Sequence, residues 1–139
     1  MRADISPSPV QIRKFQEEGP GGAIVMVNLL KFRARAEYEP AREEAAQNLT
    51  GREAYQRYGA IAFAFVHGLG KSIVWMGPQA LVFIGGAEQD WDEVICVRYP
   101  SRAKFLEMVS NPDYLAVTYH RDAGLERTAL LCCSAGSAA

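Results

Sequence analysis

The sequence has little of what marks many functional classes. Its 139 residues carry 15 Lys and Arg against 16 Asp and Glu, a net charge of −1. Nucleic-acid binding needs a basic surface that displaces counterions, and this balance gives no sign of one. No apolar run approaches the roughly 20 residues that span a bilayer, and the N-terminal stretch lacks the apolar centre of a secretory signal. We therefore expect a cytoplasmic protein without nucleic acid or membrane as partners.

Motifs that hold a metal or another cofactor are also lacking. The two histidines and three cysteines occur without an HxH, HxxxH or CxxC spacing, so they offer a metal no clustered ligands. There is no GxGxxG, no phosphate-binding loop and no GxSxG nucleophile elbow. An odd number of cysteines without CxxC fits reduced thiols. The sequence predicts neither a metal nor another cofactor.

Apolar runs separated by glycine and proline are present, and they set the order of elements. Helices are predicted over residues 8–19, 50–67, 101–109 and 111–125, each started by a capping Ser, Thr or Asn. The segment 33–49 is polar and aperiodic, with a helical turn at most over 40–46. Strands are predicted over 23–32, 71–76 with 80–84 as one bent or two short strands, 91–99 and 128–133.

After the first helix this order is β-α-β-β-α-β, which is typical of a ferredoxin-like α+β sandwich with helices on one face of four antiparallel strands. One such domain accounts for residues 1–139. The strand 23–32 is apolar on both faces over its first positions, whereas a sheet with one solvated face should alternate cleanly. The helices cover one face, and a second subunit is the economical cover of the other. We predict a homodimer whose sheets pack face to face.

Several stretches together resemble a known family. They are VMVNLLKFR, GREAYQRYG, VWMG, WDEVICVRYPSRAKFLEMVSNPDY and the closing HR. This combination is similar to the bacterial domain-of-unknown-function family thirteen-thirty, in the dimeric α/β-barrel superfamily of ferredoxin-like proteins, over nearly the whole chain. The resemblance implies the same fold, the dimer and a small-molecule pocket between the sheet and its helices. It does not select a reaction, because the superfamily spans oxygenases, isomerases, lyases, haem-handling enzymes and proteins without known activity.

Asn28 and His120 are the candidate catalytic residues. A buried amide without partners costs about 1–3 kcal/mol, and an asparagine in mid-strand runs against β preference. Asn28 therefore either holds a ligand or bonds to backbone. His120 is either a general acid or base near neutral pH or a cap at the C-terminus of its helix.

Four further residues are candidate substrate contacts. Tyr55 and Tyr58 lie on the apolar face of the second helix, as pocket walls or as core. Trp75, close to a glycine, is a further wall. Arg98 lies in a central strand. It either extends to the edge of the sheet or meets an anion, which is an acidic substrate or an internal carboxylate such as Asp92 or Glu93. Lys31 and Arg33 are expected to be solvated.

Two functions follow. The protein is a metal-independent oxygenase or isomerase, in which Asn28 orients a small organic substrate and His120 moves a proton, or it is a non-catalytic ligand-binding or interaction module. A cavity of about 300 Å³ or more on which both residues converge would favour the enzyme. An Asn28 amide bonded to backbone would favour the module.

Overall fold

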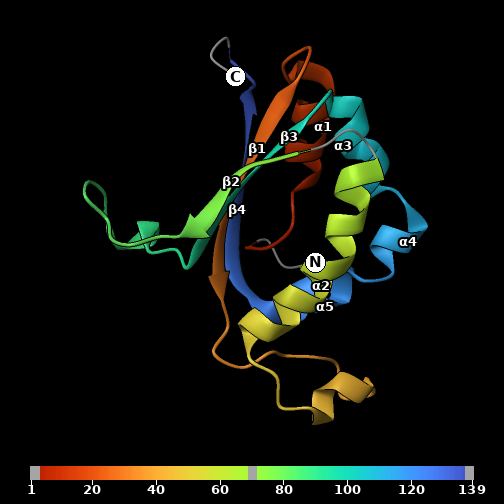
Figure 1. Ribbon diagram of the computed structural model, residues 1–139, viewed down its shortest axis with the longest axis vertical. Helices are drawn as coiled ribbons and strands as arrows, with labels where there is room; N and C mark the ends of the chain where they lie inside the picture. The colour runs from red at the N-terminus through yellow and green to blue at the C-terminus, as the bar shows by residue number, and fades with distance from the viewer. Residues whose placement is uncertain (1–3, 69–71, 137–139) are drawn as a thin grey trace.

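The computed structural model describes residues 4–68 and 72–136, with only the backbone given for 66–68. One sheet and its helices make up the structure (Figure 1). The elements in chain order are α1 (Pro9–Glu18), β1 (Ile24–Phe32), η1 (Glu43–Ala46), α2 (Gly51–Gly68), β2 (Ser72–Pro78), η2 (Ala87–Gln89), β3 (Glu93–Tyr99), α3 (Arg102–Val109), α4 (Pro112–Leu115), α5 (Thr118–Gly124) and β4 (Leu125–Ser134).

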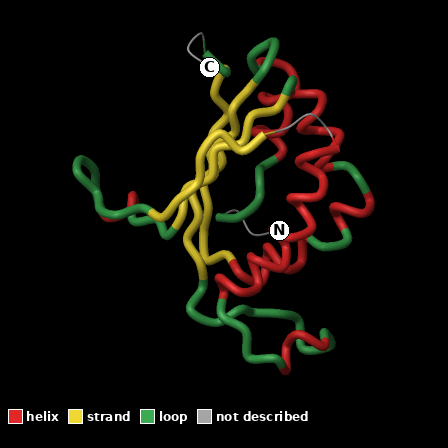
Figure 2. The backbone as a smooth tube through the Cα atoms, viewed as in Figure 1, coloured by secondary structure: helices red, strands yellow, loops and turns green. Residues whose placement is uncertain are grey.

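The four strands form one sheet in the order β2-β3-β1-β4, and every neighbouring pair is antiparallel. The helices α1 to α5 lie together on one side of it (Figure 2). This is the ferredoxin-like arrangement, and the prediction from element order is confirmed. The two central strands are β1 and β3, which are the most apolar in sequence.

Two helix starts follow the predicted caps. Before α1, the Ser8 hydroxyl accepts from the Gln11 N–H at 3.1 Å, and the Gln11 side chain accepts from the Ser8 N–H at 2.8 Å. Before α2, the Thr50 hydroxyl and the Glu53 carboxylate make the same reciprocal pair, at 3.1 and 2.9 Å. These bonds satisfy backbone N–H groups that a helix start leaves without partners, and so they fix where both helices begin.

The core lies between the sheet and the helices. Ile24, Met26 and Leu30 of β1 point to this side and are buried. Ile24 and Met26 meet side chains of β3, α3 and α4, whereas Leu30 packs with Ile5 and Leu125. At one end of the core α2 starts against the end of α5, where Gly51 and Gly124 approach so closely that a Cβ on either would overlap a backbone oxygen of the other. Glycine is required at both positions for this contact.

The predicted strand over 80–84 is wrong. β2 ends at Pro78, and residues 79–92, called the arm below, run irregularly apart from the short η2 helix. The reason is the lack of a partner strand, since pairing of β2 with β3 stops at Pro78 and Glu93. For the same reason β3 starts at Glu93 and not at residue 91. Figure 1 shows the arm leaving the sheet on the side away from the helices.

The single helix predicted over 111–125 is also wrong. It is divided into α4 and α5, and Val117 lies at the break. The Thr118 hydroxyl donates to the Leu115 carbonyl at 2.9 Å, a local bond that competes with continuation of the helix. β4 then begins at Leu125, three residues earlier than predicted, because Leu125 already pairs with Phe32. No helix among the described residues is long and apolar enough to cross a bilayer.

Candidate functional site

The strand register divides the candidate residues between two sides of the sheet. Residues that pair with Ile24, Met26, Asn28 and Leu30 face the helices. The opposite side is called the open face below. It includes Val25, Val27 and Leu29 of β1, Trp75 of β2, Val94, Cys96 and Arg98 of β3, and Ala129, Leu131 and Cys133 of β4, with Lys31 and Arg127 at its end. Asn28, Tyr55 and Tyr58 therefore lie on the helix side, whereas Trp75 and Arg98 lie on the open face and cannot line the same pocket.

Asn28 is tied to the backbone of the sheet. Its Nδ2 donates to the Ile95 carbonyl at 3.1 Å and to the Met26 carbonyl at 3.3 Å. The side chain is half-buried. Both amide protons are thus used within the protein, and only Oδ1 accepts no hydrogen bond from a described residue. The donor side of this amide is not free for a ligand.

The predicted tyrosines belong to a packed aromatic row. Phe32, Tyr55, Tyr58 and Tyr114 follow one another with ring centroids 5.2 to 5.8 Å apart. The hydroxyls of Tyr58 and Tyr114 share a hydrogen bond of 2.5 Å. Burial raises the pKa of Tyr55, Tyr58 and Tyr114, so all three stay protonated near neutral pH. Tyr58 and Tyr114 belong to the main core, and Tyr55 packs beside Leu30 and Leu125.

His120 is enclosed, with 8% of its surface exposed. The Tyr38 hydroxyl lies 2.7 Å from Nδ1, and a Glu44 carboxylate oxygen lies 3.9 Å from Nε2. Burial lowers the pKa of His120, so the imidazole is neutral near pH 7 and its contact with Glu44 is not an ion pair. The carboxylate favours the proton on Nε2, which leaves Nδ1 to accept from Tyr38.

Around His120 the chain forms a cluster of five residues, called the His120 cluster below: Tyr38, Arg42, Glu44, Tyr119 and His120. The Tyr119 hydroxyl donates to Glu44 at 2.6 Å, which lowers the pKa of the carboxyl and raises that of the phenol. The Arg42 guanidinium lies 3.6 Å from the Tyr119 ring centre. His120 does not cap the C-terminus of its helix, as the alternative prediction had it, because it lies in the first turn of α5 and bonds to Tyr38. Tyr38, Arg42 and Glu44 were not selected from the sequence. The one signal for them was the presence of a tyrosine, Tyr38, in the otherwise polar segment 33–49.

Arg98 faces away from the helices and makes no hydrogen bond or ion pair with any described residue. The two carboxylates expected for it are engaged elsewhere. Asp92 accepts from the Phe32 N–H at 2.8 Å and from Lys31 at 3.4 Å. Glu93 pairs with Arg52 at 3.3 Å. Arg98 therefore stands as a lone cation on the open face of the described chain.

Lys31 and Arg33, predicted to be solvated, are partly exposed, and each pairs with a carboxylate. The Lys31 ammonium lies 3.1 Å from Asp90, a hydrogen bond that raises the pKa of the lysine. Arg33 pairs with Glu37 at 3.0 Å. Both pairs fasten the end of β1 to the segments around it.

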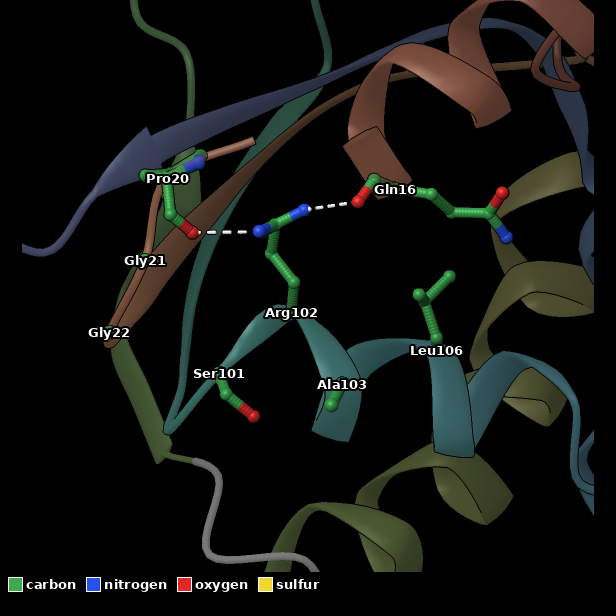
Figure 3. A pocket seen from close by; sticks show the side chains of 8 residues that line it. All are labelled: Gln16, Pro20, Gly21, Gly22, Ser101, Arg102, Ala103 and Leu106. Carbon is green, nitrogen blue, oxygen red and sulfur yellow. Dashed lines mark hydrogen bonds between the residues drawn. The ribbon is translucent and has the colours of Figure 1, made fainter. Parts of the chain in front are cut away.

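The described residues form one cavity at the end of α1 and another beside the arm, and neither is lined by Asn28 or His120. The first, of about 330 Å³, lies where Arg102 fastens the end of α1. Figure 3 shows the Arg102 guanidinium between the carbonyls of Gln16 and Pro20. The second, of about 410 Å³, lies between the open face and the arm. It is lined by Leu29, Trp91, Gln79, Gln89 and the apolar run 81–84.

The described residues contain no group of three or more His, Cys, Asp or Glu that could hold a metal ion. The three cysteines carry free thiols. The arrangement offers one neutral, enclosed imidazole, one amide bonded to backbone and one cavity of mixed polar and apolar lining on the side away from the helices.

A fold and site of this kind define a ferredoxin-like domain whose chemistry the fold does not specify. Residues 44–134 match the family model described as "Domain of unknown function (DUF1330)", and the chain belongs to this family. The prediction from the sequence motifs is confirmed. Comparison with curated protein sequences gives no match.

Solved structures are similar to this chain. A crystal structure of the methylated RPA0582 protein is 34% identical over 96% of this chain and 95% of that one, with a TM-score of 0.85. A second, of the RPA0582 protein of unknown function from Rhodopseudomonas palustris, is 33% identical over 96% and 97%, with a TM-score of 0.84. A dimeric protein of unknown function from Bacteroides fragilis, described as having a ferredoxin-like fold, is 10% identical over 81% and 95%, with a TM-score of 0.50. The last likeness bears on the fold alone.

Proposed function

We propose that the protein functions as a homodimeric binding module in which the open faces of two sheets pack against each other. The observation that carries this is the open face itself. Its central side chains are apolar, while the helices of the same chain cover only the other side (Figure 2). Two-fold packing brings the same patch of both subunits together and removes both from water. The Bacteroides fragilis protein of the same fold is described as dimeric.

The experiment compares two leucines that are exposed to nearly the same extent. Leu131 lies on the open face and is 50% exposed, and Leu115 lies in α4 and is 52% exposed. We expect wild type and Leu115→Asp to sediment as dimers at micromolar concentration, and Leu131→Asp as a monomer, because the new carboxylate would be desolvated at the interface. Trp75, 53% exposed on the same face, reports burial through a blue shift of its emission. A monomeric wild type, or equal behaviour of the two variants, would overturn the proposal.

The geometry supports a module over a metal-independent oxygenase or isomerase. The amide protons of Asn28 are bonded to strand carbonyls, and the His120 imidazole is covered by Tyr38 and Glu44. No described cavity brings the two residues together, so a substrate held by Asn28 would not meet His120. A small organic ligand fits better in the cavity of about 410 Å³ between the arm and the open face. The free thiols fit a reducing compartment, and we place the module in the cytoplasm.

A further inference from the structure

The arm carries the most exposed apolar run of the described chain. Leu81, Val82, Phe83 and Ile84 follow one another, and Phe83 and Ile84 are 91% and 87% exposed. Single exposed apolar side chains are ordinary, but a contiguous run on a projecting segment marks an interaction site. The run 81–84 is therefore an apolar surface available for contact with another chain.

The arm points toward the region where a second sheet would lie. It leaves the sheet opposite the helices (Figure 1), on the side of the open face. Fourteen residues that go out and return reach at most about 23 Å, since an extended chain spans about 3.3 Å per residue. Packed sheets are about 10 Å apart. The arm is therefore long enough to cross the gap and lie against a second subunit.

The chemistry of the arm matches that of the open face. The run 79–86 carries no charge, and the centre of the open face is neutral from Val27 across Cys96 and Leu131. The ion pairs of Lys31 with Asp90 and Asp92 lie at the base of the arm and hold it to β1. The cavity between arm and sheet, bounded by Leu29 on one side and the apolar run on the other, makes arm and open face one continuous surface. A self-complementary surface of this kind suits a second copy of the same chain.

We propose that the arm of each subunit packs its run 81–84 onto the open face of the partner subunit, so that the cavity between arm and sheet is completed only in the dimer. This inference rests on the proposed homodimer and specifies which segment crosses it. The apolar run then leaves water, and the cavity gains a wall from the second chain. Two-fold symmetry makes this contact occur twice per dimer, once for each arm.

The test is a double variant in the arm, Phe83→Asp with Ile84→Asp, against Leu115→Asp as the control on the far side. Burial of one phenylalanine from each subunit predicts that the arm variant raises the dissociation constant of the dimer at least about 100-fold in sedimentation equilibrium, whereas the control leaves it within about 3-fold. A folded arm variant with unchanged dissociation constant would overturn the inference. Because the arm is exposed in the single chain, the far-UV circular dichroism of the arm variant should match that of wild type.

A second measurement follows the arm directly. One subunit carries Phe83→Cys with its three native cysteines replaced by serine, and the other, differently tagged, keeps the native cysteines, of which Cys133 is exposed on the open face. A short bifunctional thiol reagent should join the two tags. A dimer that forms without this product contradicts the arm's position while leaving the sheet-to-sheet homodimer intact. A wild type that never dimerises removes both proposals.

Discussion

Replacement of Asn28 by aspartate turns two hydrogen bonds into two repulsions with almost no change in shape. In the wild-type chain, the Asn28 Nδ2 lies 3.1 Å from the Ile95 carbonyl and 3.3 Å from the Met26 carbonyl. The substitution removes two neutral bonds worth about 1 kcal/mol each. It also places a half-buried carboxylate oxygen against two carbonyl oxygens, which costs at least about 1–2 kcal/mol more. We expect Asn28→Asp to lower the free energy of unfolding by about 3–4 kcal/mol at pH 7.

The assay is urea unfolding at one fixed subunit concentration, because dimerisation makes apparent stability depend on concentration. The loss should lower the midpoint by about 1–3 M urea. It should also shrink in acid. The folded pKa of the new carboxyl is raised above its unfolded value, so protonation of the folded state recovers stability as the pH falls through that raised pKa. Subtracting the stability of wild type at each pH isolates the part of the pH dependence that the new carboxyl contributes.

Asn28→Leu supplies the matched control and the refuting result. Leucine removes the same donors without introducing a charge, and its extra apolar burial offsets part of the loss, so we expect a decrease of about 1 kcal/mol. A rise in stability of Asn28→Leu above wild type would mean that the amide is not retained for its backbone bonds. That outcome would refute the structural role and return Asn28 to the candidate ligand contacts.

Two further outcomes test other contacts. Arg102 donates to the carbonyls of Phe15, Gln16 and Pro20 at 2.6, 2.8 and 2.8 Å. Arg102→Met should therefore lower the free energy of unfolding by about 2–4 kcal/mol in urea titrations. The control Lys104→Met breaks only an exposed ion pair and should change the free energy of unfolding by less than about 0.5 kcal/mol. The lowered pKa of His120 means that wild-type stability falls as the pH drops from about 6.5 toward that lower pKa, and His120→Asn should remove this part of the slope in urea titrations at pH 7.5 and 5.5.

Element order was predictable from the sequence because capping residues and strand patterning act locally. Ser8, Thr50 and Asn111 each start a helix where the sequence places one, and β1 has its predicted end. The run 80–84 misled the prediction, because its apolar, β-branched composition fits a strand while the sheet offers it no partner. Composition of a segment does not reveal whether a neighbouring strand is within reach.

The sequence did not predict that the candidate residues lie on two opposite faces of the sheet. Pairing of β2 with β3 shifts register between Ile73 and Trp75, which places Val74 in an irregularity. Without that shift Trp75 would share the side of Ile73 and face the helices; with it, Trp75 lies opposite Cys96 on the open face. A bulge moves every later side chain to the other side of the sheet, and no residue type in this stretch signals it. The His120 cluster likewise depends on contacts between residues more than 70 positions apart.

The energetics of the His120 cluster argue against catalysis by that imidazole. The segment that covers it is fastened by four backbone bonds, from the N–H groups of residues 33, 36, 37 and 51, with lengths of 2.8 to 3.1 Å. The bonds of Tyr38 to His120 and of Tyr119 to Glu44 add two more. At about 1 kcal/mol each, opening the whole segment costs about 6 kcal/mol, so the open form is populated at roughly one part in 10⁴. A substrate that needed this opening would bind with its affinity reduced by the same factor, whereas the cavity beside the arm is open without any such step. Binding in the cavity beside the arm therefore requires less of this fold than chemistry at His120.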